Sequence, residues 1–305
     1  MSGNHDHTHF GHSHSHSVEL HDSYSNAFLI GIYLNIAFVV TEVVAGLIYN
    51  SIALLTDAGH NLSDVAGLVL SLLAFRFAKR KATQTFTYGY KKTTILAAFV
   101  NAVILLIAIG ILGYESINRL GNPEIVQGNV IAWVATLGII VNSVSAYLFF
   151  RNKKKDLNVK SAYLHLFSDA LVSLGVVVSG IVIIYTKWYW LDPVVGLIIM
   201  LIILLSTWTL LRDSFKMAVD AVPSGIDVQY IRETILKIHD VTDIDHIHVW
   251  PLSTTENALT AHVLLNKNLS FEEKIKLVQE IKHELEHLNI HHSTIEMDET
   301  KPVNC

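Results

Sequence analysis

Cysteine is almost missing from this sequence, since Cys305 is the only one among 305 residues. A single thiol excludes a disulfide within the chain and a thiolate-cluster metal site, which leaves His, Asp and Glu as metal ligands. Charge is also scarce: charged residues make up 16% of the chain, against about 25% in soluble proteins. The net charge of −5 gives no basic surface for nucleic acid, so we expect no nucleic acid partner.

Apolar residues are correspondingly frequent and make up 51% of the chain. Six apolar segments are each long enough for a helix that crosses the hydrocarbon core of a bilayer, which is about 30 Å thick. They cover residues 26–49, 52–77, 94–117, 129–150, 161–185 and 193–211. Asp192 and Pro193 suit the N-cap and first turn of the last segment. The sequence therefore predicts a mainly α membrane protein in contact with a lipid bilayer.

Lys and Arg predict how these segments are oriented. They gather in the loop at 79–92 and in the loop at 151–160, whereas Arg119 and Lys187 stand alone in the loops on the other side. The positive-inside rule places both basic loops, and hence both termini, in the cytoplasm. The short second basic loop and the lack of sorting signals favour a bacterial plasma (inner) membrane.

Beyond residue 211 the pattern changes to that of a small α+β domain. We expect helices at 226–238 and 270–288, and strands at 244–252, 257–265 and 293–298. Ser270 with Glu273 three residues later predicts a capping box at the second helix. The predicted division is a tail at 1–25, a six-helix transmembrane domain at 26–211 and a cytoplasmic α+β domain at 212–305.

The first 25 residues cannot bury a core, and we expect them to be disordered. Histidines nearly alternate there with small and polar residues, and such tracts commonly bind metal loosely. The alternative is an inert solvated tail. The histidines of this possible low-affinity metal tail are His5, His7, His9, His12, His14 and His16.

The pattern H-x-x-S-D occurs twice, as His60 to Asp64 in the second segment and as His165 to Asp169 in the fifth. Residues at i and i+4 share a helix face, so each helix offers one imidazole and one carboxylate side by side. Two such faces opposed supply two nitrogens and two oxygens, which suits tetrahedral zinc. A carboxylate inside a bilayer is costly and is normally functional or paired. The alternative is that these residues hydrogen-bond between helices or line a water-filled path.

Other polar groups in the apolar segments are weaker signals. Asp57 lies one turn before His60 and is a possible accessory group that attracts cations or supports the ligands. We expect interhelical hydrogen bonds from Asn35, Glu42, Asn101 and Asn142. Small residues are predicted to let helices approach closely at Gly67, Gly175, Ser179 and Gly180.

These motifs resemble the cation diffusion facilitator family, in its bacterial zinc, cobalt and cadmium efflux type. The resemblance rests on Ser51–Asp64 (SIALLTDAGHNLSD), Tyr88–Lys92 (YGYKK), His165–Asp169 and Asp245–Trp250 (DHIHVW). It implies a homodimeric cation/proton antiporter with a metallochaperone-like cytoplasmic domain. The ligand set of two His and two Asp resembles that of zinc-type members, so Zn²⁺ is the expected substrate, with Cd²⁺ and Co²⁺ as further candidates.

The resemblance also implies a second metal site in the cytoplasmic domain. Asp245, His262, Glu296 and Asp298 fall near the family's regulatory ligand positions, although Asp245 and Glu296 stand where some members have His. Nearby candidates are His246, His248, His291 and His292, which are otherwise exposed strand or loop residues. The remaining histidines of this region are interpreted as solvated helix surface, namely His239, His283 and His287.

Three classes of function fit a metal site between membrane helices. A proton-coupled exporter fits best, because metal binding needs neutral imidazole and ionised carboxylate and is therefore linked to protonation. A channel or importer would keep the ligands without needing a proton gradient. A membrane-embedded zinc enzyme would need an open water position on the metal and a nearby acid or base. Four ligands from two matching motifs leave no such position, so we expect no enzyme.

Overall fold

The computed structural model describes residues 25–150, 157–266 and 269–298. The predicted histidine tail, from His5 to His16, lies outside the described residues. The chain divides next to Phe215 into two compact units. Each unit is described by itself below.

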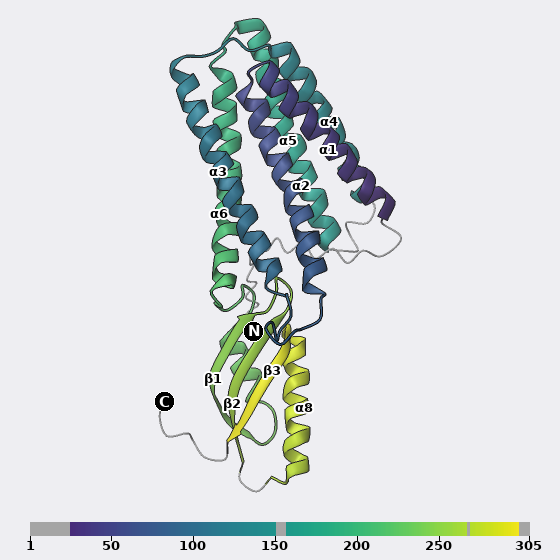
Figure 1. Ribbon diagram of the computed structural model, residues 1–305, viewed down its shortest axis with the longest axis vertical. Coiled ribbons are helices and arrows are strands. Elements are labelled where there is room, and N and C mark those ends of the chain that lie inside the picture. The colour runs from purple at the N-terminus through teal and green to yellow at the C-terminus, as the bar shows by residue number, and fades with distance from the viewer. Residues whose placement is uncertain (1–24, 151–156, 267–268, 299–305) are drawn as a thin grey trace, which may run out of the picture. The chain divides into compact units, whose positions relative to one another are not determined.

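The first unit contains, within the described residues, six long helices (Figure 1). They are α1 (Ser25–Ile48), α2 (Ile52–Ala78), α3 (Thr93–Gly121), α4 (Gly128–Phe150), α5 (Leu157–Thr186) and α6 (Leu191–Ala218). Four described stretches are long and apolar enough to cross a membrane: Thr93–Gly121, Gly128–Tyr147, Leu166–Thr186 and Leu191–Ala218. In α1, the apolar stretch Tyr33–Ile48 is shorter. The expectation of a mainly helical membrane domain is confirmed.

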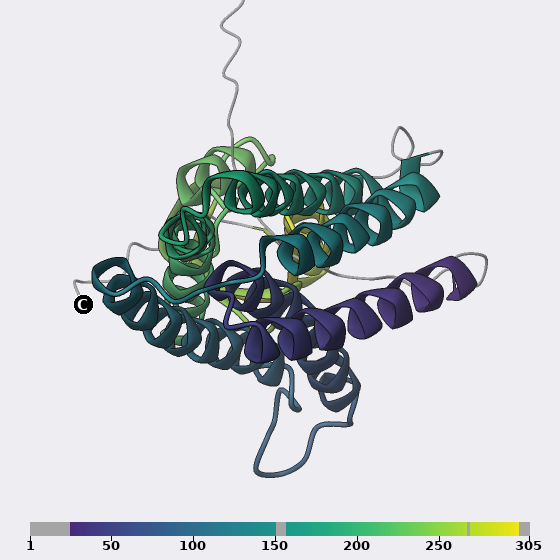
Figure 2. The same cartoon turned by 90° about the horizontal axis from the view of Figure 1, so that it is seen from above.

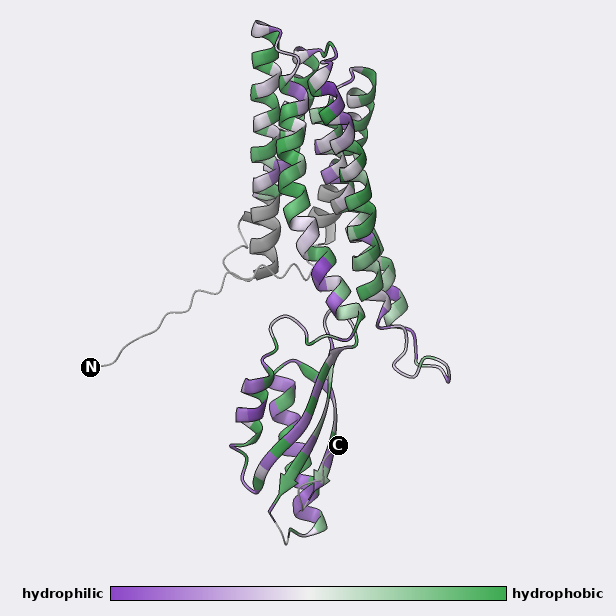
Figure 3. Cartoon of the chain, turned by 90° about the vertical axis from the view of Figure 1, so that its left-hand side faces the viewer, coloured by the Kyte–Doolittle hydropathy of each residue, from purple (hydrophilic) through white to green (hydrophobic). Residues whose placement is uncertain are grey.

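The outer surface of these helices is apolar, as a bilayer requires. Large side chains such as Ile111, Trp133, Tyr185 and Leu205 are exposed on it. Hydrophobic residues colour most of the described part of these helices in Figure 3, whereas hydrophilic residues are frequent in the second unit. A surface of this kind would drive association in water, so its solvent is lipid.

Helices α1, α2, α4 and α5 pack together, and α3 packs on α2 (Figure 2). The closest approach is between α4 and α5, where a Cβ added at Gly180 would lie 2.8 Å from the Gly128 oxygen and the Ala132 nitrogen. Gly67 likewise borders the amide of Asn101, at 3.1 Å from such a Cβ. Gly175 was expected to act in the same way, but it faces open space. That expectation is wrong, since a Cβ added at Gly175 would meet no atom of the described residues within 4 Å.

Asp192 caps a different helix from the one predicted. Helix α6 begins at Leu191, so Asp192 lies inside its first turn. The fully buried carboxylate accepts hydrogen bonds from Ser51 Oγ at 2.6 Å and from the Ile52 backbone nitrogen at 2.7 Å. Ser51 is the N-cap of α2, and its hydroxyl also accepts from the Leu54 nitrogen. Asp192 therefore ties α6 to the start of α2 and fixes the position of the helix that carries His60.

The second unit holds helices α7 (Val228–Ile235) and α8 (Phe271–His287) and strands β1 (Val241–Pro251), β2 (Asn257–Leu265) and β3 (Ile290–Asp298). The sheet order is β1-β2-β3, with β1 antiparallel and β3 parallel to β2. The helices cover one face, where Ile281 and Leu285 of α8 pack with Leu259 and Val263 of β2. The expected α+β domain and the capping box at Ser270 are confirmed.

Candidate functional site

His60 of α2 and Asp169 of α5 meet in the interior of the first unit. Their atoms Nε2 and Oδ1 are 3.3 Å apart, and the side chains are 17% and 6% exposed. This distance is longer than the usual 2.9–3.0 Å of an N–H···O hydrogen bond. Two ligand atoms on a tetrahedral zinc, each about 2.0–2.1 Å from the metal, lie about 3.3–3.4 Å apart. The pair is therefore spaced as two ligands of one zinc ion would be.

Asp64 lies one turn after His60 in α2, and His165 lies one turn before Asp169 in α5. The side chains of Asp64 and His165 lie outside what the structure describes. Helical spacing places each on the same face as its partner, because residues at i and i+4 are neighbours on a helix. Among the side chains that are described, no group of three or more His, Cys, Asp and Glu is arranged to hold a metal ion. The four-ligand set stays a prediction.

Behind this pair lies a buried polar network that joins three helices. Asp57, 1% exposed, accepts a hydrogen bond from Ser173 Oγ of α5 at 3.3 Å. Glu42 of α1 is fully buried and accepts a hydrogen bond from Asn61 Nδ2 of α2 at 3.1 Å. The interhelical hydrogen bond predicted for Glu42 is therefore confirmed. The network lies next to the helix faces that carry His60 and Asp169, and an accessory role for Asp57 stays a prediction.

Two residues of this region differ from expectation. The sequence analysis predicted no role for Ser173, although Ser173 lies four residues after Asp169 and so shares its helix face. Asn142 was predicted to hydrogen-bond between helices, but neither atom of its buried amide has a partner among the described residues. The interhelical hydrogen bond predicted for Asn142 is therefore not found among the described residues.

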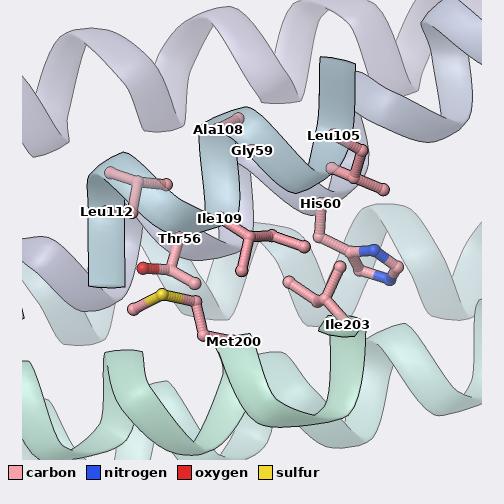
Figure 4. A pocket seen from close by; sticks show the side chains of 9 residues that line it. All are labelled: Thr56, Gly59, His60, Leu105, Ala108, Ile109, Leu112, Met200 and Ile203. Carbon is pink, nitrogen blue, oxygen red and sulfur yellow. The ribbon is translucent and has the colours of Figure 1, made fainter. Parts of the chain in front are cut away.

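A small crevice opens beside His60 (Figure 4). Its imidazole lies at one end, and apolar side chains line most of the rest. The lining comes from α2, α3 and α6 and consists of Thr56, Gly59, His60, Leu105, Ala108, Ile109, Leu112, Met200 and Ile203. His60 thus contacts Asp169 of α5 and also borders this crevice.

In the second unit, strand register brings predicted ligands into one row. Asp245 of β1 pairs with His262 of β2, which pairs with Glu296 of β3. Asp298 follows two residues later on the same face of β3. His246 lies at a register shift, and its ring centroid is 5.0 Å from that of His262. His248 pairs instead with Thr260, further along the sheet.

The contacts within this row are unequal. His262 Nδ1 is 3.4 Å from Asp298 Oδ2, and these two buried atoms have no hydrogen-bond partner in the part of the chain that the structure describes. Glu296 lies 3.5 Å from the other ring nitrogen, Nε2. Asp245 lies 3.5 Å from the guanidinium of Arg232, which also bonds Asp243 at 2.6 Å. His262 Nδ1 and Asp298 Oδ2 are therefore adjacent candidate ligands, whereas the Arg232 guanidinium disfavours a cation at Asp245.

The remaining histidines of the second unit are exposed. His239 lies in a turn after α7, and its Nδ1 is 2.8 Å from Asp240. His291 and His292 lie at the start of β3. His283 and His287 share the outer face of α8.

Comparison with known proteins covers both units. Residues 28–217 match the family model of the cation efflux transmembrane domain, and residues 223–300 match that of the cation efflux protein cytoplasmic domain. The cadmium, cobalt and zinc/H(+)-K(+) antiporter of Bacillus subtilis is 36% identical over 273 residues, which are 88% of each chain. The zinc transporter ZitB of Escherichia coli is 34% identical over 264 residues, 86% of this chain and 83% of that one. The metal cation efflux system protein CzcD of Cupriavidus metallidurans is 35% identical over 263 residues, 86% and 82% of the two chains.

Proposed function

The chain belongs to the cation efflux family, and from this premise we propose that it exports Zn²⁺ from the cytoplasm in exchange for protons. It is an integral membrane transporter of metal cations and not an enzyme, since relatives along nearly its whole length are named as transporters. Zinc is the metal in the name of the ZitB relatives, and cadmium and cobalt accompany zinc in the name of the Bacillus relative. We take Cd²⁺ and Co²⁺ as further substrates.

The observation that carries this proposal is the approach of His60 to Asp169 across α2 and α5. Their 3.3 Å separation suits ligands of one tetrahedral zinc. Asp64 and His165 complete the proposed set from the same two helix faces. Imidazole nitrogen favours zinc over the oxygen-seeking Mg²⁺ and Mn²⁺, so this donor set selects the metals that the relatives carry.

Proton exchange follows from the chemistry of the ligands. Zinc binds neutral imidazole and ionised carboxylate, so every proton that the site takes up weakens its hold on the metal. Imidazole ordinarily titrates near neutral pH, which makes His60 and His165 the exchanging groups. Metal binds while the site is open to the cytoplasm, and protons displace it while the site is open to the other side. The helices move between a conformation open to the cytoplasm and one open to the other side, which is the alternating-access mechanism.

We also propose a separate role for each part of the chain. Residues 26–211 form the transmembrane carrier, and residues 212–305 form a cytoplasmic domain through which two copies associate as a homodimer. Both termini lie in the cytoplasm, and the short loop at 151–160 favours a bacterial plasma membrane. The histidine tail at 1–25 collects scarce metal. Its deletion at residues 2–17 is expected to lower flux at scarce zinc while maximal flux stays intact, and complete loss of flux in folded protein would contradict this role.

A second metal position is supported in the cytoplasmic domain. His262 Nδ1 and Asp298 Oδ2, which have no hydrogen-bond partner among the described residues, lie 3.4 Å apart, a distance that again suits two ligands of one zinc ion. Zinc held there would join β2 to β3 and so couple metal level to the domain's stability. The substitution His262→Gln should remove one bound zinc per chain, as counted by equilibrium dialysis. An unchanged count would contradict this site.

The proposed antiport is tested in proteoliposomes that hold an internal pH dye. An imposed proton gradient should drive zinc one way while protons move the other way. Zinc movement that ignores the gradient would instead indicate a channel. Tight zinc binding without any movement would contradict transport by this protein under the assay conditions and with it the proposed exchange.

A further inference from the structure

Two histidines on the outer face of α8 are arranged differently from ordinary surface residues. His283 and His287 are exposed, and their Nε2 atoms are 3.3 Å apart. Their ring centroids are 4.6 Å apart, with the rings at 76° to each other. The two Nε2 atoms therefore lie beside each other at the surface of the helix.

The helix beneath them holds this geometry in place. The capping box of Ser270 and Glu273 closes the start of α8. Leu277, Ile281 and Leu285 are buried on its inner face against the sheet. Since i and i+4 side chains lie one above the other, the helix backbone holds the two imidazoles within reach of each other. The backbone therefore needs no further ordering when a ligand binds, and only the two side chains do.

We propose that His283 and His287 form a further metal site, a two-imidazole chelate for Zn²⁺ or another imidazole-preferring divalent cation. The 3.3 Å between the nitrogens matches the separation of about 3.3–3.4 Å between two ligands on a tetrahedral zinc. Imidazole is the neutral ligand that suits zinc, copper and nickel. Water fills the remaining positions on the ion, because both side chains face solvent.

The surroundings favour a cation at this place. Glu280 precedes His283 by three residues and Glu284 precedes His287 by three, so both carboxylates lie on the same helix face. The competing arrangement is a hydrogen bond between two neutral rings. It requires opposite tautomers at Nε2, and 3.3 Å is long for such a bond.

The chelate is separate from the row of predicted ligands on the sheet. On β2, Leu259, Ala261 and Val263 pack toward α7 and α8, while His262 alternates to the opposite face. The two metal positions thus lie on opposite sides of the three-stranded sheet. The site on α8 can therefore bind metal from the aqueous phase independently of His262.

The test reads each imidazole separately in the full-length protein in detergent. Neutral imidazoles are acylated with diethylpyrocarbonate over a series of zinc concentrations, and the modified peptides are quantified by mass spectrometry. We expect His283 and His287 to become protected together, over one concentration range. His239, whose side chain is 94% exposed, serves as the reference and stays reactive there.

The decisive variant is His283→Gln, with His239→Gln as its matched control. A chelate gains from the second ligand being already in place, so losing His283 should raise the zinc concentration that protects His287 by about 10²-fold. His239→Gln should leave both protections unchanged. Unaltered protection of His287 in His283→Gln would overturn the proposal, as would full reactivity of both residues at zinc concentrations that saturate the protein. Because the readout involves no transport, its outcome is independent of the proposed antiport.

Discussion

In the proposed site His60 would supply a nitrogen ligand, and Asp169, the other described member, an oxygen ligand. This balance decides which metals bind, because nitrogen donors favour zinc while all-oxygen sets suit Mn²⁺ and Mg²⁺. The substitution His60→Asp should therefore lower zinc flux by at least about tenfold and raise the ratio of manganese to zinc carried. Flux of the two metals in competition measures this ratio. His239→Asp on the exposed turn is the control, and a wild-type ratio in His60→Asp would contradict a ligand role for His60.

Asp192 acts on stability and not on metal. Its carboxylate is fully buried and accepts two hydrogen bonds at the start of α2. Asp192→Ala leaves Ser51 and the Ile52 nitrogen without this acceptor, which should cost about 1–3 kcal/mol of unfolding free energy. Asp213→Ala removes a more exposed carboxylate of the same helix and should cost much less. Equal midpoints of thermal unfolding in detergent for the two variants would show that the cap contributes nothing.

Individual residues were predictable where the signal is local. The spacing of His60 to Asp64 and of His165 to Asp169 pointed to α2 and α5, because i and i+4 define a helix face without any tertiary information. The role of Asp192 was not predictable, since its partners Ser51 and Ile52 are distant in sequence. Likewise, the 3.4 Å approach of His262 to Asp298 depends on the register of β2 and β3.

The contact between α4 and α5 depends on a missing side chain. A Cβ at Gly180 would lie 2.8 Å from backbone atoms of Gly128 and Ala132, closer than real Cβ contacts allow. Gly180→Ala should separate the helices and lower stability by about 1–3 kcal/mol. Gly175→Ala on the same helix meets open space and should be neutral or stabilising by up to about 1 kcal/mol. Thermal unfolding of the two variants side by side decides this, and a Gly180→Ala protein as stable as Gly175→Ala would contradict the packing.

Helix α8 should show a local dependence on pH. The Ser270 side chain and then its backbone N–H donate to Glu273, which lowers the pKa of that carboxyl below its usual value. A lowered folded-state pKa means that the cap stabilises fully above the unfolded pKa of about 4.3 and is lost as pH falls through the folded value. Amide exchange in the first turn should be slower in wild type than in Glu273→Ala at neutral pH. The difference should vanish in strong acid, and a difference that persists there would contradict this origin.

Helix existence was easier to predict than helix ends. Each of the six apolar segments became a helix because a bilayer leaves backbone groups no other partner. The ends moved by a few residues, since caps and loops set them. Helix α7 stops at Ile235 and not at 238, and β3 begins at Ile290 and not at 293, where it pairs with Asn257.

The chain consists of an apolar helical unit and a polar α+β unit that contains several candidate metal ligands. The first unit holds one described imidazole–carboxylate pair within apolar surroundings, backed by the network of Asp57 and Glu42. The second presents the row at His262 and the pair on α8. Metal ligands in the second unit would let this domain respond to the concentration of the cation that the first unit is proposed to carry.

The central claim is that the site between α2 and α5 carries zinc. Its most direct test is zinc flux under one imposed pH gradient in proteoliposomes of wild type, Asp169→Asn and Glu124→Gln, checked for equal insertion and folding. Asp169→Asn keeps the size of the side chain but removes its charge, whereas Glu124 is an exposed carboxylate outside the site. We expect wild-type flux in Glu124→Gln and loss of both zinc and proton movement in Asp169→Asn. Wild-type flux in folded Asp169→Asn would contradict the claim.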